Sequence, residues 1–339
     1  MPTIKDIARA CDVSTATVSY VINGKNTLLP ETRERVLRAM REMNYHPSAV
    51  ARGLAKKRMN TLGILFDNVG SEMAVWHPYT SGILQGVLSA SAQAGYNVTI
   101  FTELWQSAEK SLPKLRDQRT DGILIVAPPA DTDILPSLRS AGSRVVTISS
   151  ESGPFGIPSV DVDNALGITL AVEHLREMGH TRVAFLGGEP NMVSAVIRET
   201  AFREALHSSG VRVVPEYVAT ASYQHAELAY RQAQYLLTLP LPPTAVVAGN
   251  DQIAMGVLDA AQALGVAVPE RLSVVGFDDI PDVARLSVPL TTVRQPFSEI
   301  GTAATRLLLR LLSGEAVSTE TRLVAPTLTV RTTTAPPGE

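Results

Sequence analysis

The sequence predicts a small all-α head of helix-turn-helix type followed by an α/β body of two doubly wound parallel-sheet subdomains. Three observations lead to this prediction. Residues 1–60 combine short helical patterns with an excess of basic side chains. From residue 61, short β-rich runs alternate with longer helical stretches, which is typical of parallel sheets with helical crossovers. The β-rich runs form two similar groups, 62–150 and 183–277, which favours two subdomains over one very wide sheet.

Length and composition set the broad class of the protein. The 339 residues suffice for two or three domains, and 45% hydrophobic with 19% charged residues is typical of a globular chain. The single cysteine, Cys11, excludes an intramolecular disulfide and fits a reducing compartment. Residues 1–12 lack the apolar stretch of a secretory signal, and no apolar run approaches the ~20 residues that span a bilayer. We therefore expect a soluble, cytoplasmic protein with no membrane partner.

Charge is unevenly distributed along the chain. The net charge of −3 conceals a strongly basic segment, residues 1–60, and an acidic remainder. A small basic head on a larger acidic body indicates a module that binds a polyanion and is attached to a part with another task.

Two short helices separated by three residues are predicted in the head. The first covers Ile4–Ala10, with Thr3 as its N-cap and Asp6 in the capping-box position. The tripeptide "CDV" interrupts the pattern, and its Asp12 falls where a left-handed backbone is often needed. Ser14 caps the second helix, whose apolar residues recur at helical spacing. A third helix is expected from Pro30 to about Asn44.

The exposed positions of the second helix are occupied by small uncharged side chains, in the stretch "STATVSYVIN" of residues 14–23. An ordinary solvated helix would carry Glu, Lys or Gln there. In a helix-turn-helix this helix enters the DNA major groove, where bulky charged side chains would hinder close approach. Groups that suit base edges belong to Thr15, Ala16 and Tyr20. The remaining expected DNA contacts, several of them to phosphates, are Thr3, Ser14, Thr17, Ser19 and Asn23. The alternative is a plain three-helix domain with a polar face.

The motifs "TVSYVIN", "TRERV" and "NYHPSAVARGLA" resemble the head of the LacI/GalR family of bacterial transcriptional regulators. The resemblance implies that Thr15, Ala16 and Tyr20 read an operator, and Tyr20 stands where a basic residue is commoner in that family. It also implies that residues 47–60 hold a hinge helix that becomes ordered on DNA, with Leu54 wedged between base pairs. The alternative for Leu54 is packing against the body.

The body is expected to contain the following elements. The expected strands are 62–66, 98–101, 123–127, 145–149, 183–187, 245–248 and 273–277. The expected helices lie near 81–94, 107–118, 164–178, 194–209, 225–238 and 251–264. The C-terminal segment that begins at "LTTVRQP" adds another helix and strand.

The resemblance continues through "HPYTSGILQGV", "DGILIV", "SVVGFDD" and "LTTVRQP", which are similar to the periplasmic-binding-protein-like body of the same family. It implies a small ligand in the cleft between two subdomains. The expected organisation is a helix-turn-helix domain at 1–46, a hinge and linker at 47–60, an effector-binding and dimerisation domain at 61–331, and a disordered tail at 332–339. The first subdomain should comprise about 61–161 plus 292–322, and the second about 162–291 plus 323–331.

Polar residues at strand ends are the candidate effector contacts, as the resemblance implies. They are His77, Tyr79, Thr80, Ser149, Arg198, Tyr223, Asn250 and Asp278. Arginine offers a donor fork, Asp and Asn accept or bridge paired hydroxyls, and tyrosines can stack on a sugar face. The alternatives are that Asp278 caps a turn, that Arg198 pairs with Glu199, and that Tyr79 belongs to the core. Asp251 is interpreted mainly as a helix N-cap.

These observations predict a sequence-specific DNA-binding repressor, controlled by a small polar effector for which a sugar is favoured. The expected partners are a pseudo-palindromic double-stranded operator and a second copy of the chain, because one head reads only a few base pairs. A tetramer is not expected, because "TVRTTTAPPGE" offers no leucine repeat. An activator, or a regulator that needs a corepressor, is the open alternative. A soluble sugar receptor is a less favoured class. No metal, cofactor or enzymatic activity is expected, because GxSxG, Walker and HExxH motifs are absent from the sequence.

Overall fold

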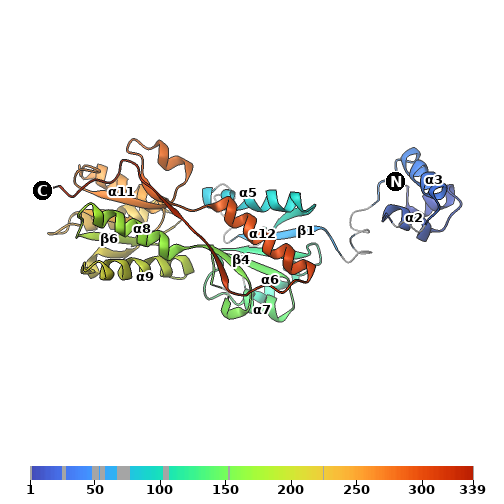
Figure 1. Cartoon of the computed structure of the whole chain (residues 1–339), viewed down its shortest axis with the longest axis horizontal. Helices are drawn as coiled ribbons and strands as arrows, with labels where there is room; N and C mark the ends of the chain where they lie inside the picture. The colour runs from blue at the N-terminus through green and yellow to red at the C-terminus, as the bar shows by residue number, and fades with distance from the viewer. Residues whose placement is uncertain are drawn as a thin grey trace. The chain divides into compact units, whose positions relative to one another are not determined.

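The computed structural model describes residues 2–24, 28–47, 53, 58–66, 77–101, 107–151, 153–223 and 225–338. It divides into two compact units, a head of Met1–Asn60 and a body of Thr61–Glu339 (Figure 1). Most of the predicted hinge, including Leu54, lies outside the described residues. The role of Leu54 therefore stays a prediction.

The head is a three-helix unit. Its helices are α1 (Ile4–Ala10), α2 (Thr15–Ile22) and α3 (Pro30–Glu42). They enclose a small core of Ile7, Ala8, Cys11, Val18, Val21 and Val36. Asp12, in the turn between α1 and α2, has a φ of 48°, in the left-handed region that the sequence led us to expect. All three predicted helices of the head are confirmed.

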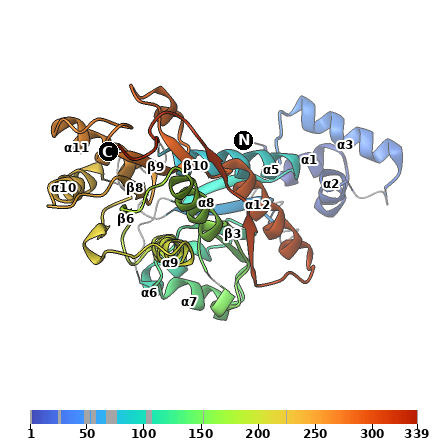
Figure 2. The same cartoon turned by 60° about the vertical axis from the view of Figure 1, so that its left-hand side comes forward.

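The first sheet of the body has six parallel strands in the order β11-β5-β4-β3-β1-β2. The strands are β1 (Thr61–Phe66), β2 (Asn97–Phe101), β3 (Gly122–Val126), β4 (Val145–Ile148), β5 (Ser159–Val162) and β11 (Thr321–Val324). Apolar side chains on one face pack against α5 (Pro78–Gln93) and α12 (Phe297–Ser313). Those on the other face pack against α6 (Ala108–Leu115) and α7 (Ile134–Ser140). Figure 2 shows α6 and α7 below β3 and α5 above it.

The second sheet has the order β12-β10-β9-β8-β6-β7, and only its edge strand β12 runs antiparallel among the pairs described. The strands are β6 (Val183–Gly187), β7 (Val218–Thr220), β8 (Ala245–Ala248), β9 (Ser273–Asp278), β10 (Thr291–Arg294) and β12 (Thr327–Thr329). One face is covered by α8 (Asn164–Glu177) and α9 (Val193–Ser208). The other is covered by α10 (Ala226–Leu237) and α11 (Asp251–Ala263). Two doubly wound subdomains are thus confirmed.

Two glycines allow α5 and α12 to cross at very short range. A Cβ atom on Gly86 would lie 2.0 Å from the Ser298 carbonyl oxygen, and one on Gly301 would lie 2.2 Å from the Ile83 oxygen. Either substitution would force the two backbones apart. The pair therefore fixes α12, which comes late in the sequence, onto the first sheet.

Several elements were not expected from the sequence. The strands β5 and β7 and the helix α7 fall in stretches interpreted as connections, and the C-terminal segment supplies three strands rather than one. The expected subdomain changes near 292 and 322 fall inside β10 and β11. Each of these strands pairs within one sheet, so the crossings come after Arg294 and after Val324.

The prediction of a disordered tail at 332–339 is wrong for its first residues. Thr333 and Thr334 are buried. The Thr291 amide donates to Thr333 Oγ1 at 2.8 Å, and that hydroxyl donates to the Val274 carbonyl at 2.6 Å. The threonines stay ordered because they satisfy backbone groups at the beginnings of β9 and β10.

Candidate functional site

The N-terminal turn of α2 presents the predicted base-reading side chains to solvent. Thr15, Ala16 and Tyr20 are exposed, whereas Val18 and Val21 are buried in the head core. Tyr20 is 40% exposed, which is high for an aromatic side chain in so small a unit. The arrangement leaves one face of α2 open for a partner.

The hydroxyl groups beside this face are partly engaged within the head. Ser14 Oγ accepts from the Thr17 amide at 3.1 Å and lies 2.9 Å from Thr17 Oγ1, so Ser14 is the N-cap as predicted. Asn23 Nδ2 donates to the Ser19 carbonyl and hydroxyl oxygens at 2.8 and 3.2 Å. Thr3 donates to Asp6 through its amide and its hydroxyl. These hydrogen bonds lie within the head and brace the exposed face of α2.

In the body, Tyr79 and Ser149 come together at the carboxyl ends of the first sheet. Tyr79, in the first turn of α5, donates its hydroxyl to Ser149 Oγ at 2.8 Å, and its ring meets that of Phe297 edge-on at 5.4 Å. Burial raises the pKa of Tyr79, so its hydroxyl remains a donor at neutral pH. The adjacent His77 and Thr80 begin the same helix, and burial lowers the pKa of His77.

Arg198 is buried and is held by neutral acceptors. It projects from α9 and is 4% exposed. Its Nε donates to Asn164 Oδ1 at 2.7 Å and its Nη1 to the Gly249 carbonyl at 2.6 Å. The guanidinium lies 3.7 Å from the Phe277 ring centroid and 5.6 Å from that of Tyr223. Glu199 pairs instead with Arg203 at 2.8 Å, so the alternative of an Arg198–Glu199 pair is wrong.

Asp278 ends β9 beside this arginine. Its backbone φ is 137°, and its Oδ1 accepts from Gln295 Nε2 at 2.5 Å. Burial raises the pKa of Asp278 to about 8, against the opposing effect of the Arg198 charge. The side chain is thus fixed by an amide of the chain segment that leads from β10 to α12.

The N-cap of α11 is Asn250 and not, as expected, Asp251. Asn250 is the N-cap of α11: its Oδ1 accepts from the Ile253 amide at 2.9 Å, and its Nδ2 donates to the Tyr223 carbonyl at 3.1 Å. Asp251 is fully buried and accepts from the Ile280 amide at 2.9 Å and from Thr292 Oγ1 at 2.5 Å. The interpretation of Asp251 as an N-cap is therefore wrong, because Asn250 holds that position. The Asp251 side chain instead ties α11 to the neighbouring strands.

Sequence reasoning missed three residues that hold this site together. Asp161 on β5 accepts from the Val162 amide at 2.7 Å and from Asn164 Nδ2 at 3.1 Å, and the Ser149 hydroxyl also bonds to it. Burial raises the pKa of Asp161 to about 6. The second residue is Asn164, which also accepts from Arg198, and the third is Gln295, which donates to Asp278. A charged residue between Val160 and Val162 in a buried run was the available signal for Asp161.

Known proteins resemble the chain along its whole length. Residues 3–48 match the description of bacterial regulatory proteins of the lacI family, and residues 172–334 match a periplasmic binding protein-like domain. The transcriptional repressor PurR of Erwinia tasmaniensis is 33% identical over 342 aligned positions, which cover 99% of this chain and 97% of PurR. The repressor CytR of Escherichia coli K12 is 32% identical, with 98% and 96% covered. The chain belongs to the LacI family.

Solved structures agree with this assignment. A lac repressor dimer bound to operator and the anti-inducer ONPF is 29% identical, with a TM-score of 0.86 and coverage of 98% of this chain and 99% of that one. A complex of the regulator CelR with cellobiose is 30% identical, with a TM-score of 0.74 and coverage of 98% and 100%. This LacI-family protein is a DNA-binding transcriptional regulator, as its sequence predicted.

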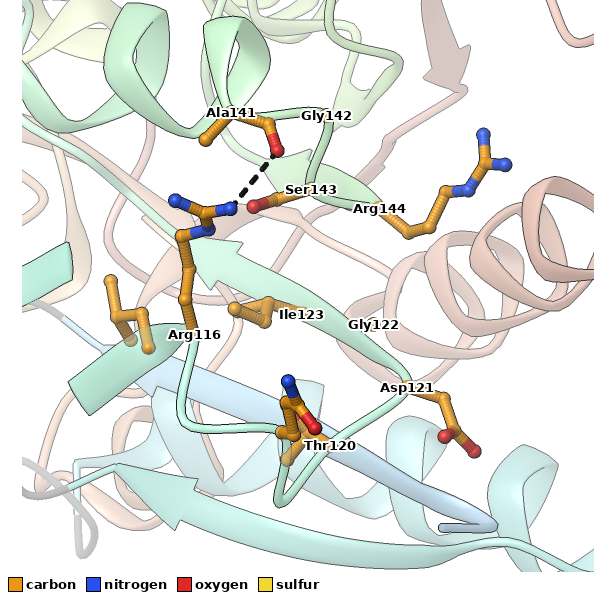
Figure 3. A pocket seen from close by; sticks show the side chains of 11 residues that line it. Arg116, Thr120, Asp121, Gly122, Ile123, Ala141, Gly142, Ser143 and Arg144 are labelled. Atoms are coloured by element: carbon orange, nitrogen blue, oxygen red, sulfur yellow. Dashed lines mark hydrogen bonds between the residues drawn. The ribbon is translucent and has the colours of Figure 1, made fainter. Parts of the chain in front are cut away.

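A separate surface pocket of this LacI-family protein lies at the opposite edge of the first sheet. It has a volume of about 240 Å³ and lies at the amino ends of β3 and β4, where Asp121 and Arg144 precede the strands. Figure 3 shows Arg116 donating to the Ala141 carbonyl, at 3.3 Å, with Arg144 directed elsewhere. Its position separates it from the residues gathered around Arg198.

The described residues contain neither a metal-binding cluster nor a membrane-spanning helix. No group of three or more His, Cys, Asp or Glu side chains there is arranged to hold a metal ion. None of the described helices combines the length and apolar character needed to cross a bilayer.

Proposed function

We propose that this protein is a cytoplasmic repressor that binds a pseudo-palindromic operator as a dimer and is controlled by a small hydroxylated effector, a sugar being favoured. The effector would bind between the two subdomains, against the residues around Arg198, Asp278 and Tyr79. The protein would bind this molecule without transforming it. Operator binding would use α2 of each head, with Thr15, Ala16 and Tyr20 at base edges.

One observation carries the effector site. Side chains from both subdomains converge at the carboxyl ends of the strands, where open α/β sheets bind ligands. Tyr79 and Ser149 come from the first, and Arg198 and Asp278 from the second. Buried donors and acceptors beside aromatic rings suit a molecule that carries several hydroxyls.

Names of relatives support the same class of ligand and partner. The lac repressor structure is a dimer that contains operator and ONPF, the CelR structure contains cellobiose, and another relative is the ribose operon repressor of Escherichia coli. Asn250 is less available to an effector than the other predicted contacts. Both of its polar groups are already hydrogen-bonded, to Ile253 and Tyr223, so it would contact an effector only by sharing them.

A thermal-shift panel of sugars and nucleosides on the full-length protein tests the proposal. A saturable rise in Tm that disappears in Arg198→Ala would support the site. Arg203→Ala is the matched control, because Arg203 lies on the same helix and pairs only with surface Glu199 among the interactions described. Ligands that stabilise Arg198→Ala as strongly as the wild type would place the effector elsewhere.

The direction of control is tested with an operator selected from a random DNA library. An inducer should weaken operator binding and, by reciprocity, should itself bind more weakly to the operator complex. An effector that strengthens operator binding would replace the induced-repressor proposal with the corepressor alternative.

A further inference from the structure

The positive charge of Arg198 is already compensated inside the cleft. Its Nε and Nη1 are engaged by Asn164 and Gly249, and its guanidinium stacks on Phe277. Its charge also acts on two buried carboxylates, Asp161 and Asp278. An incoming anion would compete with these carboxylates for the charge of a guanidinium that already donates through Nε and Nη1.

Three carboxylates at the carboxyl ends of strands have only neutral partners. Asp161 and Asp278 accept from amides, and Glu189 accepts from Ser222 Oγ at 2.6 Å and from the Tyr223 amide at 3.2 Å. Within the described part of the chain, none of the three forms an ion pair. Neighbouring Asp279 contrasts with them, because it pairs with two arginines, each at 2.6 Å.

The segments that follow the parallel strands are also acidic. In their described parts, the acidic residues are Asp131, Asp133, Glu151, Asp163, Glu189, Asp279 and Asp282. By sequence, these segments contain a single arginine, Arg285, and no lysine. An anionic ligand would find little compensation at this edge of either sheet.

The two subdomains touch beside this region, and its side chains Asp161, Arg198 and Asp278 are buried. The segment after β3 meets the segment after β6, where the Ala130 amide donates to the Asn191 carbonyl at 3.0 Å. Burial also raises the pKa values of Asp161 and Asp278, so the environment opposes the charged form of its own carboxylates. The same desolvation opposes a carboxylate or phosphate on a ligand.

We infer that the effector is non-anionic, either an uncharged polyol or one that carries a protonated amine, and that sugar acids, sugar phosphates and nucleotides are rejected. This inference rests on the proposed function, because it takes the residues around Arg198 to be the effector site. Asp161 and Glu189 set the selectivity through their charge, and neither was among the predicted contacts.

Matched ligands test the selectivity directly. Calorimetry on the full-length protein, at about pH 7.5 and constant ionic strength, would compare glucose, glucosamine, glucuronate and glucose 6-phosphate. It would also compare ribose with its 5-phosphate, and cytidine with its 5′-monophosphate. In every set that binds, we expect the acid or phosphate to bind at least tenfold more weakly than its neutral counterpart. An acid or phosphate that binds equally well or more tightly, and needs Arg198 to do so, overturns the inference but leaves the proposed site intact.

Variants test the cause without knowledge of the natural effector, with inorganic phosphate as the probe. The wild type should show no saturable binding of phosphate in the cleft. Asp161→Asn, or Glu189→Gln if the first variant folds poorly, should acquire saturable phosphate binding, and adding Arg198→Ala should abolish it. Glu173→Gln, on the exposed face of α8, is the charge-matched control. Phosphate binding that is equal in wild type, cleft variants and control contradicts charge exclusion. If neutral ligands bind equally well to wild type and Arg198→Ala, the proposed site itself is wrong.

Discussion

The recognition helix and the cleft both present polar side chains, but they hold them in opposite ways. On α2, Thr15 and Tyr20 are exposed at the surface of the head. In the cleft, Arg198 and Asp278 are 4% and 5% exposed and are fixed by hydrogen bonds to other elements. The side chains on α2 remain hydrated until a partner binds, whereas those around Arg198 were already removed from water when the protein folded. Long-range charge should therefore govern the head, and geometry the cleft.

The largest expected difference between the head and the cleft lies in how their binding affinities respond to salt concentration. If each head of a dimer neutralises about three phosphates, the log–log slope is near −5, and operator affinity falls on the order of 10³-fold between about 50 and 200 mM salt. An uncharged effector should lose less than about threefold over this range. Fluorescence anisotropy measures operator affinity, and calorimetry measures effector affinity. An operator affinity that does not respond to salt would contradict the assignment of the head surface.

Arg198→Ala should have the next largest effect, confined to the cleft. A hydrogen bond to a charged group contributes about 1.5–3 kcal/mol, so effector affinity should fall roughly 10- to 150-fold. Operator affinity without effector should stay close to that of the wild type, provided that circular dichroism shows a folded body. Unchanged effector binding in this variant would remove Arg198 from the site.

Tyr20→Ala should act on the head alone. Loss of one base-edge contact costs about 1 kcal/mol, roughly fivefold, and should change which base pair is preferred at one operator position. Selection from a random operator library measures this preference. Ser14→Ala is the control: loss of the N-cap should destabilise the head by about 1 kcal/mol and leave the order of base preferences intact. An unaltered preference in Tyr20→Ala would assign base reading to other side chains.

The pH dependence of stability gives the smallest expected effect and again concerns the cleft. Burial raises the pKa of Asp278 to about 8 in the folded protein, above its ordinary value of 3.8. Its contribution to stability is complete below about pH 4 and is lost as pH rises toward 8. Asp278→Asn cannot ionise, so its Tm relative to wild type should rise by at least about 2 °C between pH 5 and 8. Parallel Tm curves would show that Asp278 ionises as readily as in the unfolded chain.

The sequence allowed the long helices and strands to be predicted, but not the short ones. Helices such as α9 and α11 show a clear period, and strands such as β3 are continuous apolar runs. By contrast, β7 has only three residues, and α7 has seven with Pro136 inside. In β5, Asp161 interrupts the apolar pattern because it serves the cleft rather than the core.

The site was predictable in its principal residues and not in their supports. Arg198 and Asp278 came from a family resemblance. Their partners, Asn164 and Gln295, lie 34 and 17 residues away in sequence. They meet through the packing of α8 against α9 and the pairing of β10 with β9, and no local sequence pattern encodes such contacts.

The late position of α12 and β11 in the chain also has a consequence during synthesis. Strands β1 to β5 leave the ribosome first, but one face of their sheet is covered by α12 and one of its edges is paired with β11. At 5–20 residues per second, the segment between β5 and α12 takes on the order of ten seconds to be translated. During that interval the nascent first subdomain exposes an apolar face and an unpaired edge, a surface that chaperones bind. Chains that end before residue 297 should therefore aggregate rather than accumulate as a folded fragment.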